Sequence, residues 1–361
     1  MICILTGVFI MTTKKTTIQD IADSLGYSRT TVSKALNDAT GISAKTKNIV
    51  IERAKALGYK AFQCEDPPAN PYSIEKPQPA GNIALFLNMI PDSFHMSSYL
   101  MMSLEQALGK IGYSLSLHLI TEVEIKNFTV PASFHASNVD AIFCLEIYDK
   151  PYSEFICSLG KPVLFSDAYS TFEQGDLPAD VLVADNFRAS VKLYSSIIEE
   201  SHPTTVGYMG DPNFSLSFYD RFKGFLELMN RYEFADDYKK HSIIAPEQKF
   251  HDDMWVENQF KTIELPRFLV CSNDFFAMKA LTCLERINKK VPKDIMVCGY
   301  DGTPAISSLY PSLTTIIAPS QEMGVMAAEM LSHKIKNPSL PNMIITMNSK
   351  IWKNYTTGSA C

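Results

Sequence analysis

Residues 16–60 carry the pattern that most limits how this chain can fold: two short amphipathic helices joined by a turn that contains Gly26. Thr17 can cap the first helix together with Asp20, three positions further on, and Gly26 permits the left-handed backbone that such a turn requires. Ser28 can cap the second helix. The pattern predicts a helix-turn-helix.

The second helix of this pair has an apolar and a polar face. Val32, Ala35 and Leu36 recur at helical spacing and form an inward stripe. The outward face carries short hydroxyl side chains and two cations, contributed by Arg29, Thr30, Thr31, Ser33 and Lys34. Such a face suits a DNA groove, whereas helical periodicity alone also fits a small bundle with ordinary solvated charges.

A third helix is predicted from a Ser43 cap to a Gly58 stop, which completes a three-helix headpiece over residues 16–60.

The positive charge of the chain is concentrated in this segment. Met11 to Lys60 contain nine Lys/Arg and four Asp/Glu, net +5; the chain totals of 33 and 39 leave 24 cations and 35 anions elsewhere, net −11. Cations confined to a docking face are what phosphate neutralisation requires.

The residue order of the headpiece is more specific than its periodicity. The matching segments are Thr17-Ile18-Gln19-Asp20-Ile21-Ala22, Gly26-Tyr27-Ser28, Thr31-Val32-Ser33-Lys34, Asn37, Ile42-Ser43-Ala44-Lys45-Thr46 and Leu57-Gly58-Tyr59. In this order they resemble the DNA-binding headpiece of the LacI/GalR family of bacterial repressors. The resemblance implies that base edges are read by Arg29, Thr30 and Lys34, and that phosphates are held mainly by Thr17, Ser28, Thr31, Ser33, Asn37, Ser43 and Thr46.

Two segments flank the headpiece. Residues 1–15 begin with an apolar decapeptide that lacks a basic region and is too short to span a bilayer, so we interpret them as a tail or as a misassigned start before Met11. Residues 61–81 form a linker rich in proline, which disfavours helix interiors. The hinge-helix pattern of typical family members is missing there, so a leucine wedge in the minor groove cannot be carried over.

Residues 82–357 alternate between apolar strands and helices, the signature of parallel sheets. The expected fold class is α/β: the helix-turn-helix headpiece followed by a two-lobed, doubly wound parallel domain. We expect lobe 1 to comprise about 82–184 and 320–341, and lobe 2 about 185–319 and 342–357. The chain would then cross between the lobes near Asp185, Pro319 and Pro341.

This region resembles the effector domain of the same family, a relative of periplasmic sugar-binding proteins. The matching segments are Val183-Ala184-Asp185-Asn186, Arg221-Phe222-Lys223-Gly224-Phe225, Cys271-Ser272-Asn273-Asp274, Val291-Pro292-Lys293-Asp294-Ile295, Gly299-Tyr300-Asp301, Pro311-Ser312-Leu313-Thr314-Thr315 and Met323-Gly324. A cleft between two such lobes is where a small polar ligand would bind.

Sugar recognition needs planar polar groups and an apolar ring. The resemblance assigns effector contacts to Phe94, Asp167, Ser217, Arg221, Trp255, Asn273 and Asp301. Each residue type also has a structural interpretation: Asp301 could cap a turn, Asn273 could start the next helix, and Trp255 could be half-exposed core. Where the family often has a polar contact this chain has Ala318, so the ligand does not follow from better-known members.

Other classes of function find little support. The chain has no phosphate-binding loop, no zinc-protease helix motif and no nucleophile elbow, and its seven histidines are dispersed, so we expect no enzyme. Its eight cysteines are scattered, which indicates reduced thiols and no metal or other cofactor.

We therefore expect a cytoplasmic homodimer that binds operator DNA, most simply as a repressor, and responds to a small effector such as a sugar or sugar phosphate, with no membrane partner. A DNA-binding module controlled by a protein partner, with a vestigial cleft, is the alternative. A solute-binding protein would fit residues 82–357 alone.

Overall fold

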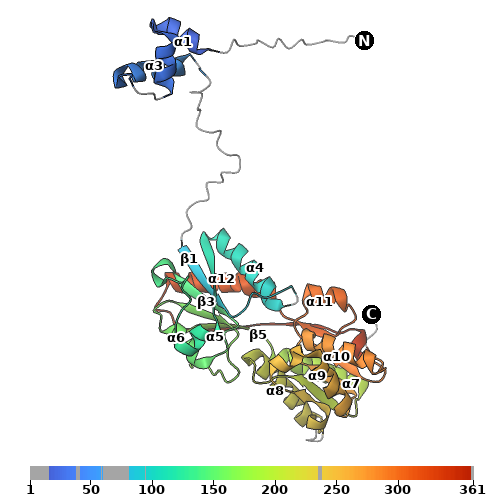
Figure 1. Ribbon diagram of the computed structural model, residues 1–361. Coiled ribbons are helices and arrows are strands. Elements are labelled where there is room, and N and C mark those ends of the chain that lie inside the picture. Colours follow the sequence, from blue (N-terminus) through green and yellow to red (C-terminus); the bar gives the residue numbers. More distant parts are fainter. Residues whose placement is uncertain are drawn as a thin grey trace, which may run out of the picture. The chain divides into compact units, whose positions relative to one another are not determined.

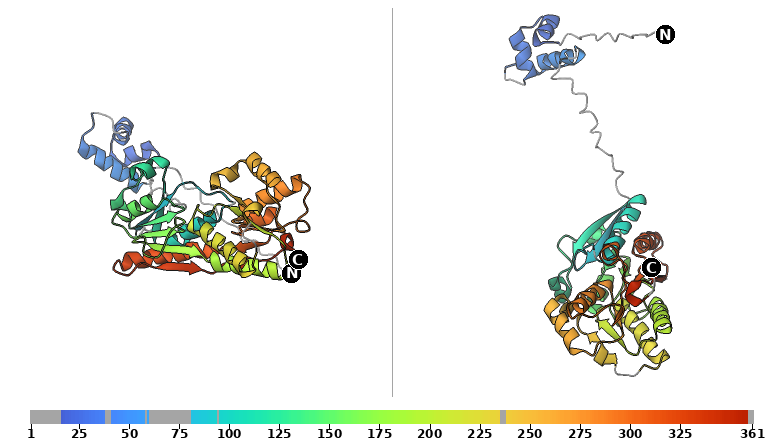
Figure 2. Two further views of the ribbon diagram at one scale, coloured as in Figure 1. Left: turned by 90° about the horizontal axis from the view of Figure 1, so that it is seen from below. Right: turned by 90° about the vertical axis from the view of Figure 1, so that its right-hand side faces the viewer.

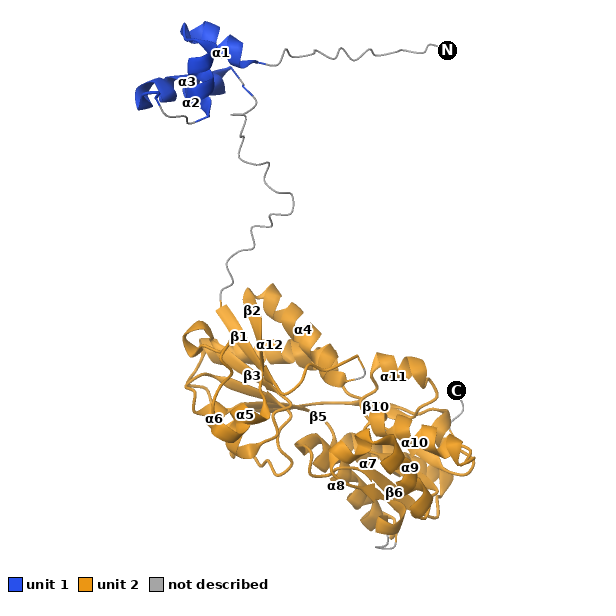
Figure 3. Cartoon of the chain, viewed as in Figure 1, with its two compact units in different colours: residues 1–76 blue, residues 77–361 orange. Residues whose placement is uncertain are grey.

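The protein divides into two compact units, residues 1–76 and 77–361 (Figure 3). The computed structural model describes residues 16–37, 41–57, 59, 81–93, 95–234 and 238–358. The expected N-terminal tail and residues 61–80 of the expected linker lie outside these ranges, as does Phe94.

The described residues of the first unit form three helices: α1 (Ile18–Leu25), α2 (Arg29–Leu36) and α3 (Ala44–Ala56). Their small core is built from Ile21, Ala22, Val32, Ala35, Val50 and Ala54, all essentially inaccessible to solvent. Gly26 ends α1 at φ 69°, in the left-handed region where a side chain would be strained. This arrangement is the predicted helix-turn-helix followed by a third helix.

The second unit contains two lobes (Figures 1 and 2). Lobe 1 is built on a six-stranded parallel sheet with strand order β11-β5-β4-β3-β1-β2. Its strands are β1 (Gly81–Leu87), β2 (Tyr113–Leu119), β3 (Ala141–Leu145), β4 (Val163–Ser166), β5 (Asp180–Ala184) and β11 (Ile344–Met347). Both sheet faces are covered, because residues 83–87 of β1 are buried continuously.

The helices of lobe 1 pack on its two faces. Helices α4 (Met96–Lys110) and α12 (Ser320–Lys336) contribute to the apolar cluster of one face, and α5 (Glu122–Asn127) and α6 (Lys150–Cys157) to that of the other. Leu85 and Phe86, adjacent on β1, belong to different clusters, as the alternation of side chains along a strand requires.

Lobe 2 is built on a four-stranded parallel sheet with order β7-β6-β8-β9. Its strands are β6 (Val206–Gly210), β7 (Ile243–Ile244), β8 (Phe268–Cys271) and β9 (Met296–Cys298), with an antiparallel pair β10 (Thr315–Ile317) and β12 (Lys350–Trp352) beside them. Helices α7 (Phe187–Ser201) and α8 (Leu216–Arg231) contribute to the same apolar cluster as α4 and α12, and α9 (Asp253–Thr262) and α10 (Asp274–Arg286) to another. Helix α11 (Pro304–Leu309) follows β9, and four 3-10 helices lie at Ala136–Asn138, Tyr238–His241, Glu247–His251 and Tyr355–Thr357.

The chain passes between the sheets at three places. Two match the expectation: 185–186, between β5 and α7, and 318–319, between β10 and α12. The third differs, because β11 pairs with β5 and so extends the sheet of lobe 1. The crossing expected near Pro341 therefore lies at 348–349, between β11 and β12. β11 is a short strand with alternating burial at the edge of the sheet, and its sequence alone does not indicate which strand it pairs with.

Candidate functional site

The headpiece presents three helix N-termini, each capped by a hydroxyl side chain. Thr17 and Asp20 form a reciprocal capping box, and Ser28 and Ser43 accept hydrogen bonds from the backbone N–H groups of Thr31 (3.1 Å) and Thr46 (3.2 Å). Each of these two serines also pairs with the hydroxyl of its threonine at 2.8 Å. Helix N-termini are favourable positions for phosphate groups.

The outward face of α2 lies as predicted. Val32 and Ala35 are buried, whereas Arg29, Thr30 and Lys34 are exposed and Thr31 and Ser33 are partly exposed. Asn37 is exposed at the end of the helix. The face is therefore polar, cationic and accessible, as an element that enters a DNA groove must be.

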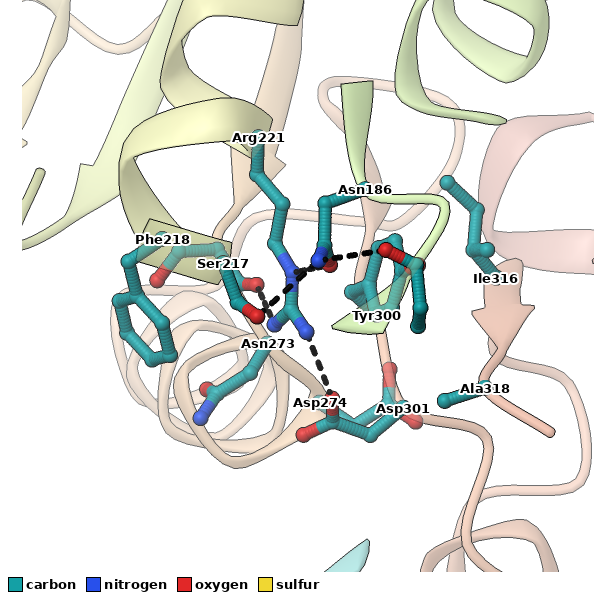
Figure 4. A network of polar contacts seen from close by, with 12 residues as sticks. Asn186, Ser217, Phe218, Arg221, Asn273, Asp274, Tyr300, Asp301, Ile316 and Ala318 are labelled. Atoms are coloured by element: carbon teal, nitrogen blue, oxygen red, sulfur yellow. Dashed lines mark hydrogen bonds and ion pairs between the residues drawn. The ribbon is translucent and has the colours of Figure 1, made fainter. Parts of the chain in front are cut away.

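In the second unit, Arg221 on α8 is the centre of a buried polar network (Figure 4). Its Nε atom donates to Asn186 Oδ1 at 2.9 Å, Nη1 to the carbonyl of Ser272 at 2.7 Å, and Nη2 to Asp301 Oδ1 at 3.2 Å. The side chain of Arg221 is 3% exposed and that of Asp301 14% exposed. Because three donors are fixed in one plane, the guanidinium has a defined orientation.

Aromatic rings cover this guanidinium. The Cζ atom of Arg221 lies 3.6 Å from the ring centroid of Tyr300 and 5.4 Å from that of Phe218. Burial alone would lower the pKa of Arg221, but the Asp301 carboxylate raises it and the net shift is upward. The arginine therefore remains charged in the lobe interior.

Two carboxylates at this site are buried. Burial raises the pKa of Asp301, and the charge of Arg221 only partly opposes this effect. Burial likewise raises the pKa of Asp167, against hydrogen bonds from Ala168, Ser215 and Ser217.

Asp167 and Ser217 join the two lobes. Asp167 follows β4 of lobe 1 and accepts a hydrogen bond from the backbone N–H of Ser217 on α8 at 3.1 Å. The hydroxyl of Ser217 accepts a hydrogen bond from Asn186 Nδ2 at 3.0 Å, and Asn186 also binds Arg221. The structure thus brings together four of the predicted residues: Asp167, Ser217, Arg221 and Asp301.

The other predicted residues have structural roles as well. Asn273 caps α10 by accepting a hydrogen bond from the N–H of Phe276 at 2.9 Å, the alternative weighed for it. Trp255 on α9 is partly buried and packs edge-on against Phe250, with centroids 5.5 Å apart. Phe94 lies outside the described residues.

Sequence reasoning missed several members of the site. Asn186 belonged to a matched motif but received no role, although its amide holds both Arg221 and Ser217. His95 and Glu146 of lobe 1 lie close enough for their charges to act on the pKa of Asp301 across the lobes. Glu146 follows β3 at φ 59°, and this backbone strain has no signature in the sequence.

Comparison with known proteins agrees with both units. Residues 17–61 match the family model described as bacterial regulatory proteins, lacI family, and residues 198–351 match a periplasmic binding protein-like domain. The chain is 28% identical over 331 residues to the ribose operon repressor of Bacillus subtilis, covering 92% of this chain and 95% of that protein. It is 24% identical over 348 residues to the ribose operon repressor of Halalkalibacterium halodurans, covering 95% and 97%.

Solved structures show the same architecture. A complex of the transcriptional regulator CelR with cellobiose superposes with a TM-score of 0.65 at 16% identity and covers 95% of this chain and 100% of that one. The lac repressor dimer bound to operator gives a TM-score of 0.64 at 18% identity, with coverage of 95% and 99%. A LacI-family regulator from Enterococcus faecium with bound ribose gives 0.63 at 20%, with coverage of 76% and 98%.

A helix-turn-helix headpiece joined to a two-lobed binding-protein-like unit defines a DNA-binding transcription regulator. The chain combines a headpiece that matches the lacI family of bacterial regulatory proteins with a periplasmic binding protein-like domain, and it is similar over nearly its whole length to ribose operon repressors. Among the described helices none is both long and apolar enough to traverse a bilayer. No group of three or more His, Cys, Asp or Glu is placed to hold a metal ion in the part of the chain that the structure describes.

Proposed function

We propose that this protein is a cytoplasmic, sequence-specific repressor that binds operator DNA as a homodimer and changes its operator affinity when a sugar binds between the two lobes. The observation that carries the proposal is that one chain has both an accessible cationic face on α2, in the first unit, and a buried Arg221–Asp301 ion pair, in the second. Recognition of DNA and of a small ligand is thereby divided between two units.

The DNA part of the proposal assigns base reading to α2. Arg29, Thr30 and Lys34 would contact base edges, while the capped helix N-termini would hold phosphates. Two headpieces in a dimer would meet two half-sites, so the operator should be nearly palindromic.

This part is tested by selecting fragmented genomic DNA with the purified protein near physiological salt and sequencing what is retained. We expect one near-palindromic site to be enriched. Arg29→Ala should weaken binding to that site by about 1–3 kcal/mol and relax the preference at one base position. Lys55→Ala, an exposed cation on α3, is the matched control and should weaken all DNA equally. An equal loss of random and operator DNA in Arg29→Ala would rule out base reading.

The ligand part of the proposal favours an unphosphorylated sugar. Relatives include ribose operon repressors, and similar structures hold ribose or cellobiose. The carboxyl groups of Glu146, Asp167 and Asp301 lie near Arg221, and His95, which is charged only when protonated, pairs with Glu146 at 3.2 Å. Vicinal hydroxyls can donate to carboxylates, whereas a phosphate would be repelled by them.

The ligand part is tested by thermal unfolding of the full chain with D-ribose and with D-ribose 5-phosphate. We expect D-ribose to stabilise the second unit and the phosphate ester to have little effect; a ligand at one hundred times its Kd stabilises by about 2.7 kcal/mol. Arg221→Ala should abolish the response, and Arg231→Ala on the same helix, whose guanidinium is exposed and paired with Glu227, should preserve it. Stronger stabilisation by the phosphate ester would refute this assignment.

A further inference from the structure

Tyr300 and Asp301 contact all three crossings between the lobes. The hydroxyl of Tyr300 donates to the carbonyl of Asp185 at 3.1 Å, in the first crossing. It also forms a 2.8 Å hydrogen bond with the hydroxyl of Ser349, in the third. The carbonyl of Asp301 accepts from the N–H of Ala318, in the second, at 3.1 Å.

The direction of these bonds follows from the chemistry of the groups. Burial raises the pKa of Tyr300, so its hydroxyl keeps its proton. A phenol has one proton, and the carbonyl of Asp185 can only accept it, so the hydroxyl of Ser349 donates to the phenol oxygen. The hydroxyl of Tyr300 thus forms hydrogen bonds with two crossings at once.

The same two residues hold the guanidinium of the ligand site. The ring of Tyr300 stacks on Arg221 at 3.6 Å, and the carboxylate of Asp301 binds its Nη2 atom. Asn186, which follows Asp185 in the first crossing, accepts from the Nε atom of Arg221. Arg221 thus contacts the first crossing directly through Asn186 and reaches all three crossings through Tyr300 and Asp301. Figure 4 shows Asn186, Tyr300 and Asp301 around the guanidinium.

We infer that Tyr300 is a positioning residue that latches the first and third crossings and couples their geometry to the Arg221–Asp301 pair. A ligand that moves the guanidinium or the carboxylate shifts Tyr300 and Asp301, and with them the segments about which the lobes rotate. The inference rests on the proposed function, because it names how occupancy of that site reaches the crossings.

Substitution of Tyr300 by phenylalanine isolates the latch. Tyr300→Phe keeps the ring on Arg221 and removes only the hydroxyl. The matched control is Tyr194→Phe, because Tyr194 on α7 is equally buried in lobe 2 and packs on Phe268 rather than on a crossing.

The experiment is hydrogen–deuterium exchange of the full-length protein without ligand, followed by mass spectrometry. In the wild type, the N–H of Asp185 is bonded to the carbonyl of Met347 and that of Ala318 to Asp301. We expect Tyr300→Phe to speed exchange in peptides that contain the first and third crossings about fivefold, the factor that corresponds to one net hydrogen bond. Ser349→Ala should have a smaller effect in the same peptides, and Tyr194→Phe should leave them at the wild-type rate.

Crossing peptides that exchange at the wild-type rate in Tyr300→Phe would overturn the inference, and so would equal acceleration in Tyr194→Phe. A general loss of stability is recognised by peptides of α5 and α6, which belong to a different apolar cluster from Tyr300 and should not change. Selection of operator DNA is measured separately on the wild type, so a failure of the proposed function is distinct from a failure of the latch.

Discussion

At the residue scale, we expect the carboxyl group of Asp274 to make the free energy of unfolding depend on pH. Its Oδ atoms accept from Thr315 Oγ1 at 2.6 Å and from the N–H of Gly302 at 2.8 Å, and burial together with Asp301 holds its pKa well above the usual value. The folded protein therefore binds this proton more tightly than the unfolded chain. The contribution of Asp274 to the free energy of unfolding is present at low pH and falls as pH rises towards the folded pKa, by up to about 1.4 kcal/mol per unit.

Asp274→Asn should remove this contribution, so the free energy of unfolding should fall less in the variant than in the wild type as pH rises above about 4, the pKa of an aspartate in the unfolded chain. Urea titrations at several pH values measure the free energy of unfolding of both proteins. Asp176→Asn is the control of opposite sign, since the hydrogen bond from Tyr169 lowers the pKa of Asp176 and its contribution is lost as pH falls. Parallel pH profiles for wild type and Asp274→Asn would contradict the assignment.

Single residues also show what could be predicted from the sequence. Arg221 and Asp301 were assigned to the effector site by resemblance of their motifs to those of the family, and the structure pairs them. Asn186 was missed as a site member because its role depends on Ser217, which only the fold brings near it. Tyr300 could be interpreted from the sequence as a cleft-lining or a packing aromatic, but its hydrogen bonds to Asp185 and Ser349 could not be predicted. No single segment of sequence holds both halves of such a contact.

At the scale of elements, the packing of α12 on α4 depends on Gly324. A Cβ atom added there would lie 2.0 Å from Ser103 Oγ and 2.4 Å from the carbonyl of Leu100. Gly324→Ala must therefore separate the two helices and should lower the free energy of unfolding by about 1–3 kcal/mol. Gly109 of α4 is exposed and meets no atom within 4 Å, so Gly109→Ala should raise it by about 0.5–1 kcal/mol.

Chemical denaturation of both variants measures the contrast. Equal effects would mean that helix propensity, rather than contact between α4 and α12, controls the response at Gly324. Helix and strand periodicity predicted most of these elements, because their apolar spacing is local. It could not place β11, whose partner β5 lies far away in the chain.

At the scale of the whole molecule, lobe 1 leaves an apolar sheet edge exposed. β2 is the last strand of its sheet, and its Leu117 and Leu119 are each 42% exposed, while Met102 of α4 is 58% exposed. Residues 117 and 119 pair with Leu85 and Leu87, which face the α4 side. An uncovered edge of this kind promotes association, and a second copy of the chain is the occupant that the proposed homodimer supplies.

Replacement of both edge leucines by lysine, Leu117→Lys with Leu119→Lys, should therefore convert the dimer into a monomer in sedimentation velocity. Both side chains are 42% exposed in the single chain, so thermal unfolding of lobe 1 should change little. Val123→Lys, 63% exposed on α5, adds a charge elsewhere on the lobe and should leave the dimer intact. When one headpiece of a dimer binds a half-site, the second headpiece is held close to the other half-site of the near-palindromic operator, so its binding is effectively intramolecular. The monomer should consequently lose operator affinity far more than affinity for a single half-site, and equal losses on both DNAs would show that β2 does not form the dimer.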